Sequence, residues 1–399
     1  MNRLKIALYT QSFPPKGGGV STSHFNMFKL LNDTYNVKVF AFNENENFTS
    51  ETLVKRKTIR WFTNLLFQII KFKYKSNSKF SKLTNVKSIV NSFVPVIRLN
   101  SELKKFNPDI IIIPDYNIPN YVIRKPRNSK LVLIAHHNYL RFQNNLMIES
   151  HDWLDLSIAS SMEKKAMNKV DAIISPSQFM ISKYKDSLYK NKPIFCIHNF
   201  IEQRNFIKLK TNLKTQKHFP KDKQIVYIPS AGSVIKGKRY VFEIVRRLLS
   251  YDKNIFFYLT GEIPDDLNFE LSKFKDNIYA PGHINWEANL ANVMMCHIGI
   301  TPNLEENFSN AILEAQIAGL PFVAFDTGGN KEIIINDYTG FIVPFLDVES
   351  LILKSCYLLN DYKKREVFQN NAVNSYTERF ADNLILSNYD TVLTEINNL

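Results

Sequence analysis

Short apolar runs alternate with longer stretches of helical periodicity from the first residues onward. Residues 4–9 form an apolar run typical of a buried strand, and residues 21–31 place Met27 and Leu31 on one face of a predicted helix. A second strand is predicted at 37–41. A strand, a glycine-rich loop, a helix and another strand in this order predict the start of a doubly wound α/β unit.

The same alternation continues through two halves that a polar segment separates. Residues 201–223 are rich in lysine and lack apolar periodicity, which is typical of a domain boundary. We predict a first Rossmann-like domain over 1–205, a second over 206–380, and a C-terminal helix within 381–399 that crosses back to the first domain. Further strands are predicted near 108–114, 130–135, 171–177 and 194–199 in the first half, and near 224–229, 255–261, 278–283, 298–300, 322–325 and 340–344 in the second.

The stretch 301–332 combines two carboxylates with the start of a helix. A loop containing Glu306 leads into a helix that begins near Ser309 and is closed by Gly319, with Glu314 just inside it. Helix N-termini bind phosphate, and carboxylates bind the vicinal hydroxyls of ribose. The stretch therefore indicates a pocket for a nucleotide diphosphate carrying a sugar. The alternative is that both glutamates are capping or surface residues, worth about 0.3–1 kcal/mol.

Three other loops carry candidate chemistry. His136 follows the predicted strand 130–135, and ligands in open α/β sheets bind beyond the carboxyl ends of strands. The loop 230–238 presents glycines and Lys236 before a helix, which suits phosphate. The glycine loop 13–19 allows close approach of a ligand, although it is neither GxGxxG nor a P-loop. A structural hydrogen bond for the histidine and plain connecting turns for the loops are the alternatives.

The chain is basic, with a formal net charge of +14 at pH 7 and a pI of about 9.4. No acidic residue lies between Glu51 and Glu102, and within 55–87 basic residues alternate with apolar residues at helical spacing. This pattern fits a basic amphipathic helix on an anionic membrane surface. It equally fits a helix whose apolar face packs on its own domain. Nucleic acid is not an expected partner, because no nucleic-acid-binding motif accompanies the segment.

The length of the chain, the spacing of its cysteines and the length of its apolar runs exclude several classes of protein. A chain of 399 residues with 45% hydrophobic residues fits two or three packed domains. The three cysteines form no CxxC or Cys/His spacing, so neither a disulfide framework nor a zinc site is expected. We expect no signal peptide and no membrane span, since no stretch approaches the roughly 20 apolar residues that a span requires. The expected location is cytoplasmic, either free or peripheral on the inner face of the membrane.

The stretch 301–332 resembles one block of the retaining glycosyltransferases of family 4. Glu306, seven further residues and then Glu314, followed by AILEAQIAGLP, carry the resemblance. Weaker matches follow in order through the chain: FPPKGGG, VLIAH, DAIISPS, HNFIE and the lysine-glycine pair at Lys236. The resemblance implies the α/β GT-B fold, in which two Rossmann-like doubly wound domains face each other across a cleft.

The resemblance also implies roles for individual residues. Glu306 would contact the donor sugar, Glu314 the nucleotide ribose and Lys236 the diphosphate. His136 would lie near the reacting sugar, so His136, Glu306 and Lys236 are the candidate catalytic residues. The other candidate donor-binding residues are Gly18 and Gly19 of the N-terminal loop, Gly232, Ser233 and Lys238 of the lysine-glycine loop, and Phe308, Ser309 and Asn310 before the helix.

The chain departs from the family pattern at two positions. Ser233 stands where an arginine usually follows the glycine, which leaves Lys238 or Arg239 as the substitute cation. Asn307 replaces the usual glycine after the first glutamate and is expected to narrow the sugar pocket. A nucleoside diphosphate leaves as a polyanion, so catalysis needs positive potential beside it. Because no Asp-x-Asp pair occurs in the chain, we expect transfer without a metal or other cofactor.

The predicted function is the retaining transfer of a hexose or N-acetylhexosamine from a UDP- or GDP-sugar. The acceptor would be a glycan or lipid-linked glycan in bacterial surface polysaccharide or glycolipid synthesis. One alternative is a non-catalytic module of the same fold that binds a sugar nucleotide or a membrane. Another is a different GT-B enzyme such as a nucleotide-sugar epimerase, which would convert the donor alone. The joint presence of Lys236, Glu306 and Glu314 argues against the non-catalytic module.

Overall fold

The computed structural model of the chain forms two compact units. The first contains Met1–His198 together with Ile385–Leu399, and the second contains Asn199–Leu384. The structure describes residues 3–11, 18–41, 64–65, 68–69, 72, 83–143, 145, 147, 152–211 and 219–399.

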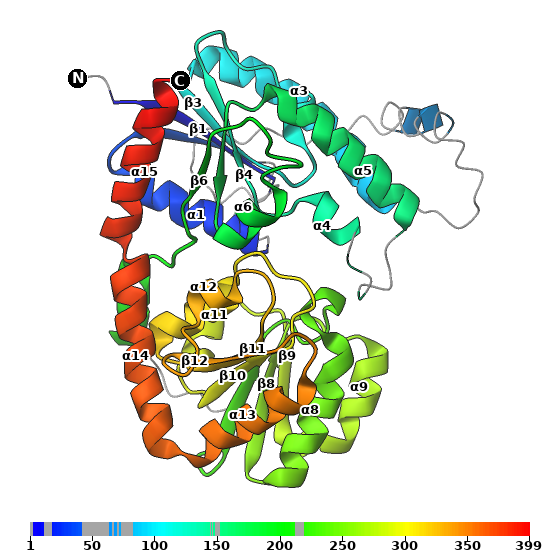
Figure 1. Ribbon diagram of the computed structural model, residues 1–399, viewed down its shortest axis with the longest axis vertical. Helices are drawn as coiled ribbons and strands as arrows, with labels where there is room; N and C mark the ends of the chain where they lie inside the picture. Colours follow the sequence, from blue (N-terminus) through cyan, green and yellow to red (C-terminus); the bar gives the residue numbers. More distant parts are fainter. Residues whose placement is uncertain are drawn as a thin grey trace. The chain divides into compact units, whose positions relative to one another are not determined.

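The first unit is built around a sheet of six described strands, seen in the upper half of Figure 1. The strand order is β2-β1-β3-β4-β5-β6, and each neighbouring pair is parallel. The strands are β1 (Lys5–Thr10), β2 (Asn36–Ala41), β3 (Ile110–Pro114), β4 (Lys130–Ile134), β5 (Ala172–Ser175) and β6 (Ile194–Cys196). The helices are α1 (Gly19–Asn32), α3 (Thr84–Phe106), α4 (Tyr139–Gln143), α5 (Trp153–Ala166) and α6 (Gln178–Tyr184), together with α15 (Asp382–Asn397) from Ile385 onward.

The apolar runs of this unit become strands that are buried on both faces. A parallel strand needs apolar side chains on both faces because helices cover both sides of the sheet. β3 meets this need with four consecutive isoleucines, and all of its residues are buried. Ile111 and Ile113 share one core cluster with Leu99 and Leu103 of α3. The helix therefore packs on the sheet face to which these two isoleucines point.

The second unit repeats the arrangement with its own six-stranded parallel sheet, of order β12-β11-β10-β7-β8-β9. Its strands are β7 (Gln224–Ile228), β8 (Ile255–Thr260), β9 (Ile278–Gly282), β10 (Ile298–Thr301), β11 (Phe322–Phe325) and β12 (Gly340–Val343). Its helices are α7 (Gln203–Thr211), α8 (Lys238–Tyr251), α9 (Asp265–Leu271), α10 (Trp286–Val293), α11 (Asn310–Ala318), α12 (Asn330–Ile333), α13 (Val348–Asn360) and α14 (Tyr362–Phe380).

Two separate cores cover the two faces of this second sheet. Val226 of β7 belongs to the same cluster as Leu351 of α13, whereas its neighbours Ile225 and Tyr227 belong to the cluster of Ile312 in α11. Adjacent residues of a strand point to opposite faces, so helices lie on both sides of the sheet. The expectation of two doubly wound α/β sheets is confirmed.

The contacts divide the chain at His198/Asn199, before the polar segment in which the sequence places the boundary. Ile201 explains the difference, since its N–H donates to Tyr376 Oη and its carbonyl accepts from the same hydroxyl, both at 2.8 Å. These bonds attach the start of the polar segment to α14. Near the end of the chain, Asp390 of α15 accepts a hydrogen bond from Tyr35 Oη at 2.6 Å within the first unit.

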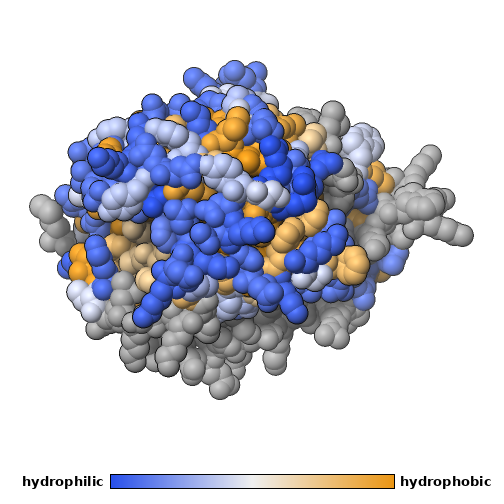
Figure 2. All heavy atoms as spheres, turned by 90° about the horizontal axis from the view of Figure 1, so that it is seen from below, coloured by the Kyte–Doolittle hydropathy of each residue, from blue (hydrophilic) through white to orange (hydrophobic). Residues whose placement is uncertain are grey.

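The visible surface is mainly hydrophilic. Figure 2, seen from below the view of Figure 1, shows apolar residues in small groups among polar ones. Among the described helices, none is both long and apolar enough to cross a membrane. Most of the segment 55–87 lies outside the described residues. Within it Leu65, Ile69 and Phe72 are helical and 51%, 54% and 87% exposed, so a membrane-facing role for the segment stays a prediction.

Candidate functional site

A partly buried ion pair lies beyond the carboxyl end of β10 in the second unit. Lys236 Nζ is 2.5 Å from Glu306 Oε2. The same oxygen accepts a hydrogen bond from Asn303 Nδ2 at 2.8 Å, and Oε1 accepts from the backbone N–H of Asn307 at 3.1 Å. The glutamate side chain is 8% exposed and the lysine side chain 27%. Two candidate residues 70 positions apart in sequence are therefore in direct contact.

Backbone contacts fix the loop of this glutamate to the lysine loop. The N–H groups of Leu304 and Glu305 both donate to the carbonyl of Ile235, at 3.0 and 3.2 Å. Gly237 lies against the same loop with φ +86°, and a Cβ there would be 2.0 Å from the Pro302 carbonyl oxygen. Position 237 thus requires glycine both for space and for its positive φ.

The turn after β11 supports the same loop. Gly328 has φ +59°, and a Cβ there would be 2.0 Å from the backbone oxygen of Glu306. The N–H of Gly329 donates to the carbonyl of Asn307 at 2.8 Å. The Asp-Thr-Gly-Gly segment after β11 therefore holds the glutamate loop by close backbone contact.

The start of α11 carries the residues predicted to offer backbone amides. Ser309 is the N-cap, and its hydroxyl accepts from a backbone N–H of the first turn at 3.4 Å. Asn310 Oδ1 accepts from Asn199 Nδ2 at 2.9 Å. The ring of Phe308 is buried and lies 5.9 Å from the Phe380 ring. The side chain of Phe308 therefore packs in the core, and its backbone is the part suited to a ligand.

Glu314 lies one helical turn further along α11, in a buried environment. Its Oε1 accepts a hydrogen bond from Trp286 Nε1 at 3.1 Å. Burial raises the pKa of Glu314 to about 7, and the bond from the indole opposes this rise. Nothing in the sequence pattern singles out Trp286, because its contact with Glu314 joins two separate helices, α10 and α11.

The lysine-glycine loop is shaped by packing as well as by charge. A Cβ at Gly232 would lie 1.9 Å from the Glu262 carbonyl oxygen, so only glycine allows the segment after β8 to pack this closely against the loop. The Ser233 carbonyl accepts from the N–H groups of Lys236 and Lys238 at 3.0 and 3.1 Å. The ammonium of Lys238, the predicted substitute cation, is in an ion pair with Asp266 of α9. A phosphate at Lys238 would therefore compete with that carboxylate.

In the first unit, His136 lies just beyond β4 and beside a second histidine. Its ring centre is 5.4 Å from that of His24, on α1. Burial lowers the pKa of His24 to about 4 and, together with nearby positive charge, lowers the pKa of His136 well below its usual value. Both imidazoles are therefore neutral at pH 7, a state in which one ring nitrogen donates and the other accepts a hydrogen bond.

The segment after β4 is held by a buried aspartate that the sequence analysis missed. Asp115, directly after β3, accepts from the N–H of His137 with both carboxylate oxygens at 2.8 Å and from the N–H of Asn138 at 2.9 Å. Burial raises the pKa of Asp115 to about 6, although these hydrogen bonds oppose the shift. The sequence did contain a signal for this aspartate. Asp115 directly follows one strand, and the histidines directly follow the next strand of the sheet, so their side chains could be expected to lie close together.

Replacing Asp115 with alanine is expected to destabilise the first unit by several kcal/mol. The change leaves the buried N–H of Asn138 and the partly buried N–H of His137 without their acceptor, and an unsatisfied buried group costs about 1–3 kcal/mol. Chemical denaturation followed by circular dichroism measures the loss. Asp109→Ala is the matched control, because Asp109 accepts one exposed backbone bond from Lys5 at 2.7 Å. Equal losses in the two variants would contradict the role of Asp115 as a buried support.

The glycines predicted to approach phosphate lie at the start of α1. Gly19 is the first residue of the helix and Gly18 its N-cap. A Cβ built on Gly18 would meet no described residue within 4 Å. Gly17 and the rest of the loop from Phe13 lie outside the described residues.

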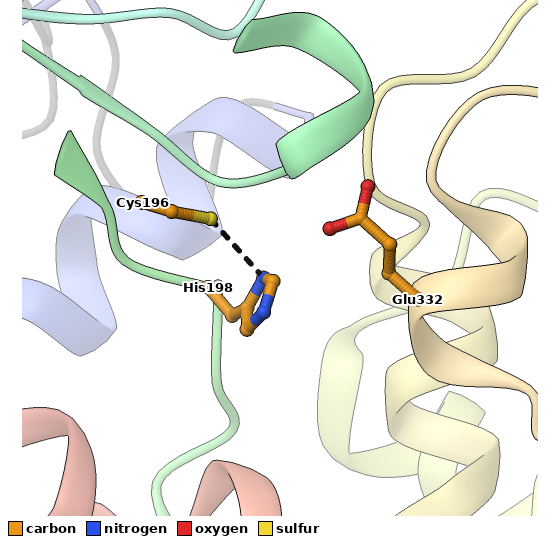
Figure 3. A group of neighbouring side chains, drawn as sticks. All are labelled: Cys196, His198 and Glu332. Carbon is orange, nitrogen blue, oxygen red and sulfur yellow. Dashed lines mark hydrogen bonds between the residues drawn. The ribbon is translucent and has the colours of Figure 1, made fainter. Parts of the chain in front are cut away.

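The end of β6 places a cysteine beside a histidine (Figure 3). Cys196 Sγ is 4.0 Å from His198 Nδ1, and the same nitrogen is 2.8 Å from the Pro176 carbonyl oxygen. The carbonyl can only accept, so Nδ1 carries the proton. Figure 3 also labels Glu332, which belongs to the second unit. Within the first unit the pair offers two ligands, fewer than a structural zinc site needs. The expectation of metal-independent chemistry stays a prediction.

Comparison with protein families gives two matches that follow one another along the chain. Residues 17–204 match the model described as Glycosyltransferase Family 4. Residues 210–375 match the model described as Glycosyl transferases group 1. The two matches cover nearly all of both units.

Curated relatives are distant. An N-acetyl-alpha-D-glucosaminyl L-malate synthase from Bacillus anthracis is 22% identical over 57% of this chain and 60% of its own length. The capsular polysaccharide biosynthesis glycosyltransferase CapM from Staphylococcus aureus is 25% identical over 59% of this chain and 65% of its own length. The chain thus spans about two thirds or less of these two relatives. An uncharacterized glycosyltransferase from Methanocaldococcus jannaschii is 20% identical over 95% of both chains.

Solved structures share the fold at low sequence identity. Sucrose-phosphate synthase from Thermosynechococcus elongatus superposes with a TM-score of 0.77 at 15% identity, covering 99% of both chains. TarM superposes with a TM-score of 0.70 at 15% identity, also over 99% of both chains. Anabaena HepE in complex with UDP-glucose has a TM-score of 0.63 at 16% identity, over 98% of this chain and 100% of its own.

Proposed function

Because the chain belongs to the family 4, group 1 glycosyltransferases of GT-B fold, we propose that it transfers a hexose or N-acetylhexosamine from a UDP- or GDP-sugar with retention of configuration. The acceptor is a glycan or lipid-linked glycan of surface polysaccharide or glycolipid synthesis. The observation that supports the proposal most is the contact of Lys236 with Glu306 beyond the end of β10. A cation and a carboxylate held together there suit the diphosphate and the hydroxyls of one donor.

The donor is bound, in this proposal, through four parts of the second unit. The ammonium of Lys236 binds the diphosphate, and the start of α11 adds its N–H groups and partial positive charge. Glu306 exchanges its bond with Lys236 for hydroxyls of the sugar. Glu314 accepts hydrogen bonds from the ribose. Each part then binds the chemical group that its charge and hydrogen-bonding capacity suit best.

The proposed chemistry is a front-face displacement. The bond between the anomeric carbon and the diphosphate oxygen breaks while a bond to the acceptor hydroxyl forms on the same face. The acceptor proton passes to the departing phosphate oxygen. Lys236 stabilises the charge that develops on that oxygen, a contribution of the kind that preorganised donors supply in transition states. No metal is required in this scheme, because the charge is met by the lysine and the helix N-terminus.

The names of related proteins support the choice of donor and acceptor. A relative from Escherichia coli, 27% identical over 30% of this chain and 31% of its own length, is named for transfer from UDP-Gal to a sugar on diphosphoundecaprenol. Structures of TarM and of HepE contain UDP. A uridine nucleotide is therefore the first donor to test. A lipid-linked acceptor at the inner face of the membrane would give the basic segment 55–87 its role.

The proposal is tested by a thermal-shift screen of nucleotide sugars, followed by mass spectrometry of products with a lipid-linked acceptor. A ligand at 100 times its Kd stabilises the folded protein by about 2.7 kcal/mol, which is readily seen in the melting temperature. We expect one base to stabilise the protein and the sugar to appear on the acceptor. Conversion of the donor with no acceptor present would favour an epimerase. No stabilisation by any UDP- or GDP-sugar would refute the proposed transferase.

A further inference from the structure

We propose that Trp286 is a positioning residue of the nucleotide site, whose indole N–H orients the Glu314 carboxylate and keeps it an acceptor for the ribose hydroxyls. The proposal rests on the proposed function, in which Glu314 receives the ribose. It extends that function by one residue, because ribose binding by Glu314 of α11 then depends on the indole of Trp286 in the neighbouring helix α10. The geometric basis is the bond of 3.1 Å from Trp286 Nε1 to Glu314 Oε1.

Trp286 is held in place by the helix that it begins. Asn285 caps α10 by accepting from the N–H of Ala288 at 2.7 Å, so the first turn has a fixed orientation. Further along α10, Asn289 accepts a hydrogen bond from Tyr258 Oη at 2.9 Å. This bond attaches the helix to β8 of the sheet. The indole therefore approaches α11 from a rigid support, as a positioning group must.

The indole bond has a chemical consequence for the carboxylate. A carboxylate has about four acceptor sites on its two oxygens, so one indole N–H leaves capacity for two ribose hydroxyls. A protonated carboxyl would instead use one oxygen as a donor and lose that capacity. The indole is a donor only, and it therefore stabilises the ionised form and opposes protonation.

The buried surroundings of Glu314 favour its protonated form, and the bond from Trp286 opposes this. Burial raises the pKa of Glu314 to about 7, and among described residues the bond from Trp286 is the one interaction that lowers it. No charged side chain of the described residues contributes to the shift. Among the described residues, the titratable group that interacts with it is Tyr227 of β7, whose ring is stacked on Tyr258 of β8 at 5.3 Å. Burial raises the pKa of both phenols, so both are neutral near pH 7.

The sign of the pH dependence follows. Ribose binding needs the ionised carboxylate, so donor affinity rises as the pH rises through about 7. Between pH 6 and pH 8 the wild-type affinity is expected to increase about tenfold, because the ionised fraction increases by that factor. Without the indole bond, the pKa of Glu314 lies higher and the whole profile moves to higher pH.

Calorimetric titration of UDP-glucose, with GDP-mannose as a second probe, tests the proposal between pH 6 and pH 8.5. Neither diphosphate diester titrates in this range, so the protein determines the profile. Trp286→Phe is expected to weaken binding about 10- to 100-fold at pH 7, the value of one hydrogen bond to a charged group, and less at pH 8.5. Glu314→Gln is expected to bind weakly at every pH. Trp153→Phe is the matched control, since Trp153 is exposed and, like Trp286, is the first residue of a helix with a side-chain N-cap.

The 2′-deoxyribose analogue of the bound nucleotide sugar separates positioning from packing. If Trp286 acts through Glu314 and the ribose, Trp286→Phe weakens the analogue much less than the parent compound. Equal weakening of both compounds with an unchanged pH profile would overturn the proposal while leaving the donor site intact. If the wild-type protein binds neither probe nor any nucleotide sugar of the thermal-shift screen, the proposed function fails and this inference fails with it. The chain has three tryptophans, so the difference in fluorescence between the wild type and Trp286→Phe on titration isolates the signal of Trp286 and gives an independent measure of binding.

Discussion

Replacing Lys236 with alanine is expected to lower the kcat of sugar transfer by about 100- to 1,000-fold. Loss of one preorganised donor at a site of developing charge has an effect of this size. The variant also leaves Glu306, 8% exposed, without the ammonium that it contacts at 2.5 Å. The measurement is the steady-state rate with the donor identified by thermal shift, together with the melting temperature.

The matched control for this prediction is Lys364→Ala. Lys364 is 30% exposed and forms an ion pair of 3.1 Å with Asp337, whereas Lys236 is 27% exposed. Both variants remove a half-buried lysine from a carboxylate of the same unit. Only Lys236→Ala is expected to lower kcat, and Lys236→Arg should retain part of the rate because the charge remains. A wild-type rate in Lys236→Ala would exclude the lysine from the chemistry.

Replacing Gly328 with alanine is expected to destabilise the second unit by about 2–5 kcal/mol. A left-handed conformation costs an L-residue about 1–2 kcal/mol, and forcing extra atoms into a packed site costs about 1–3 kcal/mol. Both terms apply, because φ is +59° and the new Cβ would lie 2.0 Å from the backbone oxygen of Glu306. Urea denaturation measures the free energy of unfolding, and donor affinity measures the displacement of the glutamate loop.

Gly282 offers a control that separates the two terms. It has φ +75°, but a Cβ built there would meet no described residue within 4 Å. Gly282→Ala should therefore show the cost of backbone strain alone, about 1–2 kcal/mol. A Gly328→Ala variant no less stable than Gly282→Ala would show that the glutamate loop yields to the added methyl group. The close backbone support described for Glu306 would then be wrong.

The elements of both units are predictable from the sequence because they depend on local periodicity. Four consecutive isoleucines followed by Pro114 predict a strand buried on both faces, and β3 is such a strand. The C-terminal helix predicted within 381–399 is α15, and its amphipathic pattern is local as well. The polar stretch 201–223 begins just after the division of the two units at His198/Asn199. Its attachment to α14 is made by the backbone of Ile201, which leaves no trace in side-chain composition.

For the candidate site, too, part can be predicted from the sequence and part depends on the tertiary structure. The residue types of Lys236, Glu306 and Glu314, and the glycines around them, follow from a motif of fixed spacing and can be read along the chain. Which atoms meet could not be read, because contacts between separate elements depend on how these elements pack. Tertiary structure alone pairs Lys236 with Glu306, places Asp115 beneath the segment of His136 and brings the indole of Trp286 to Glu314.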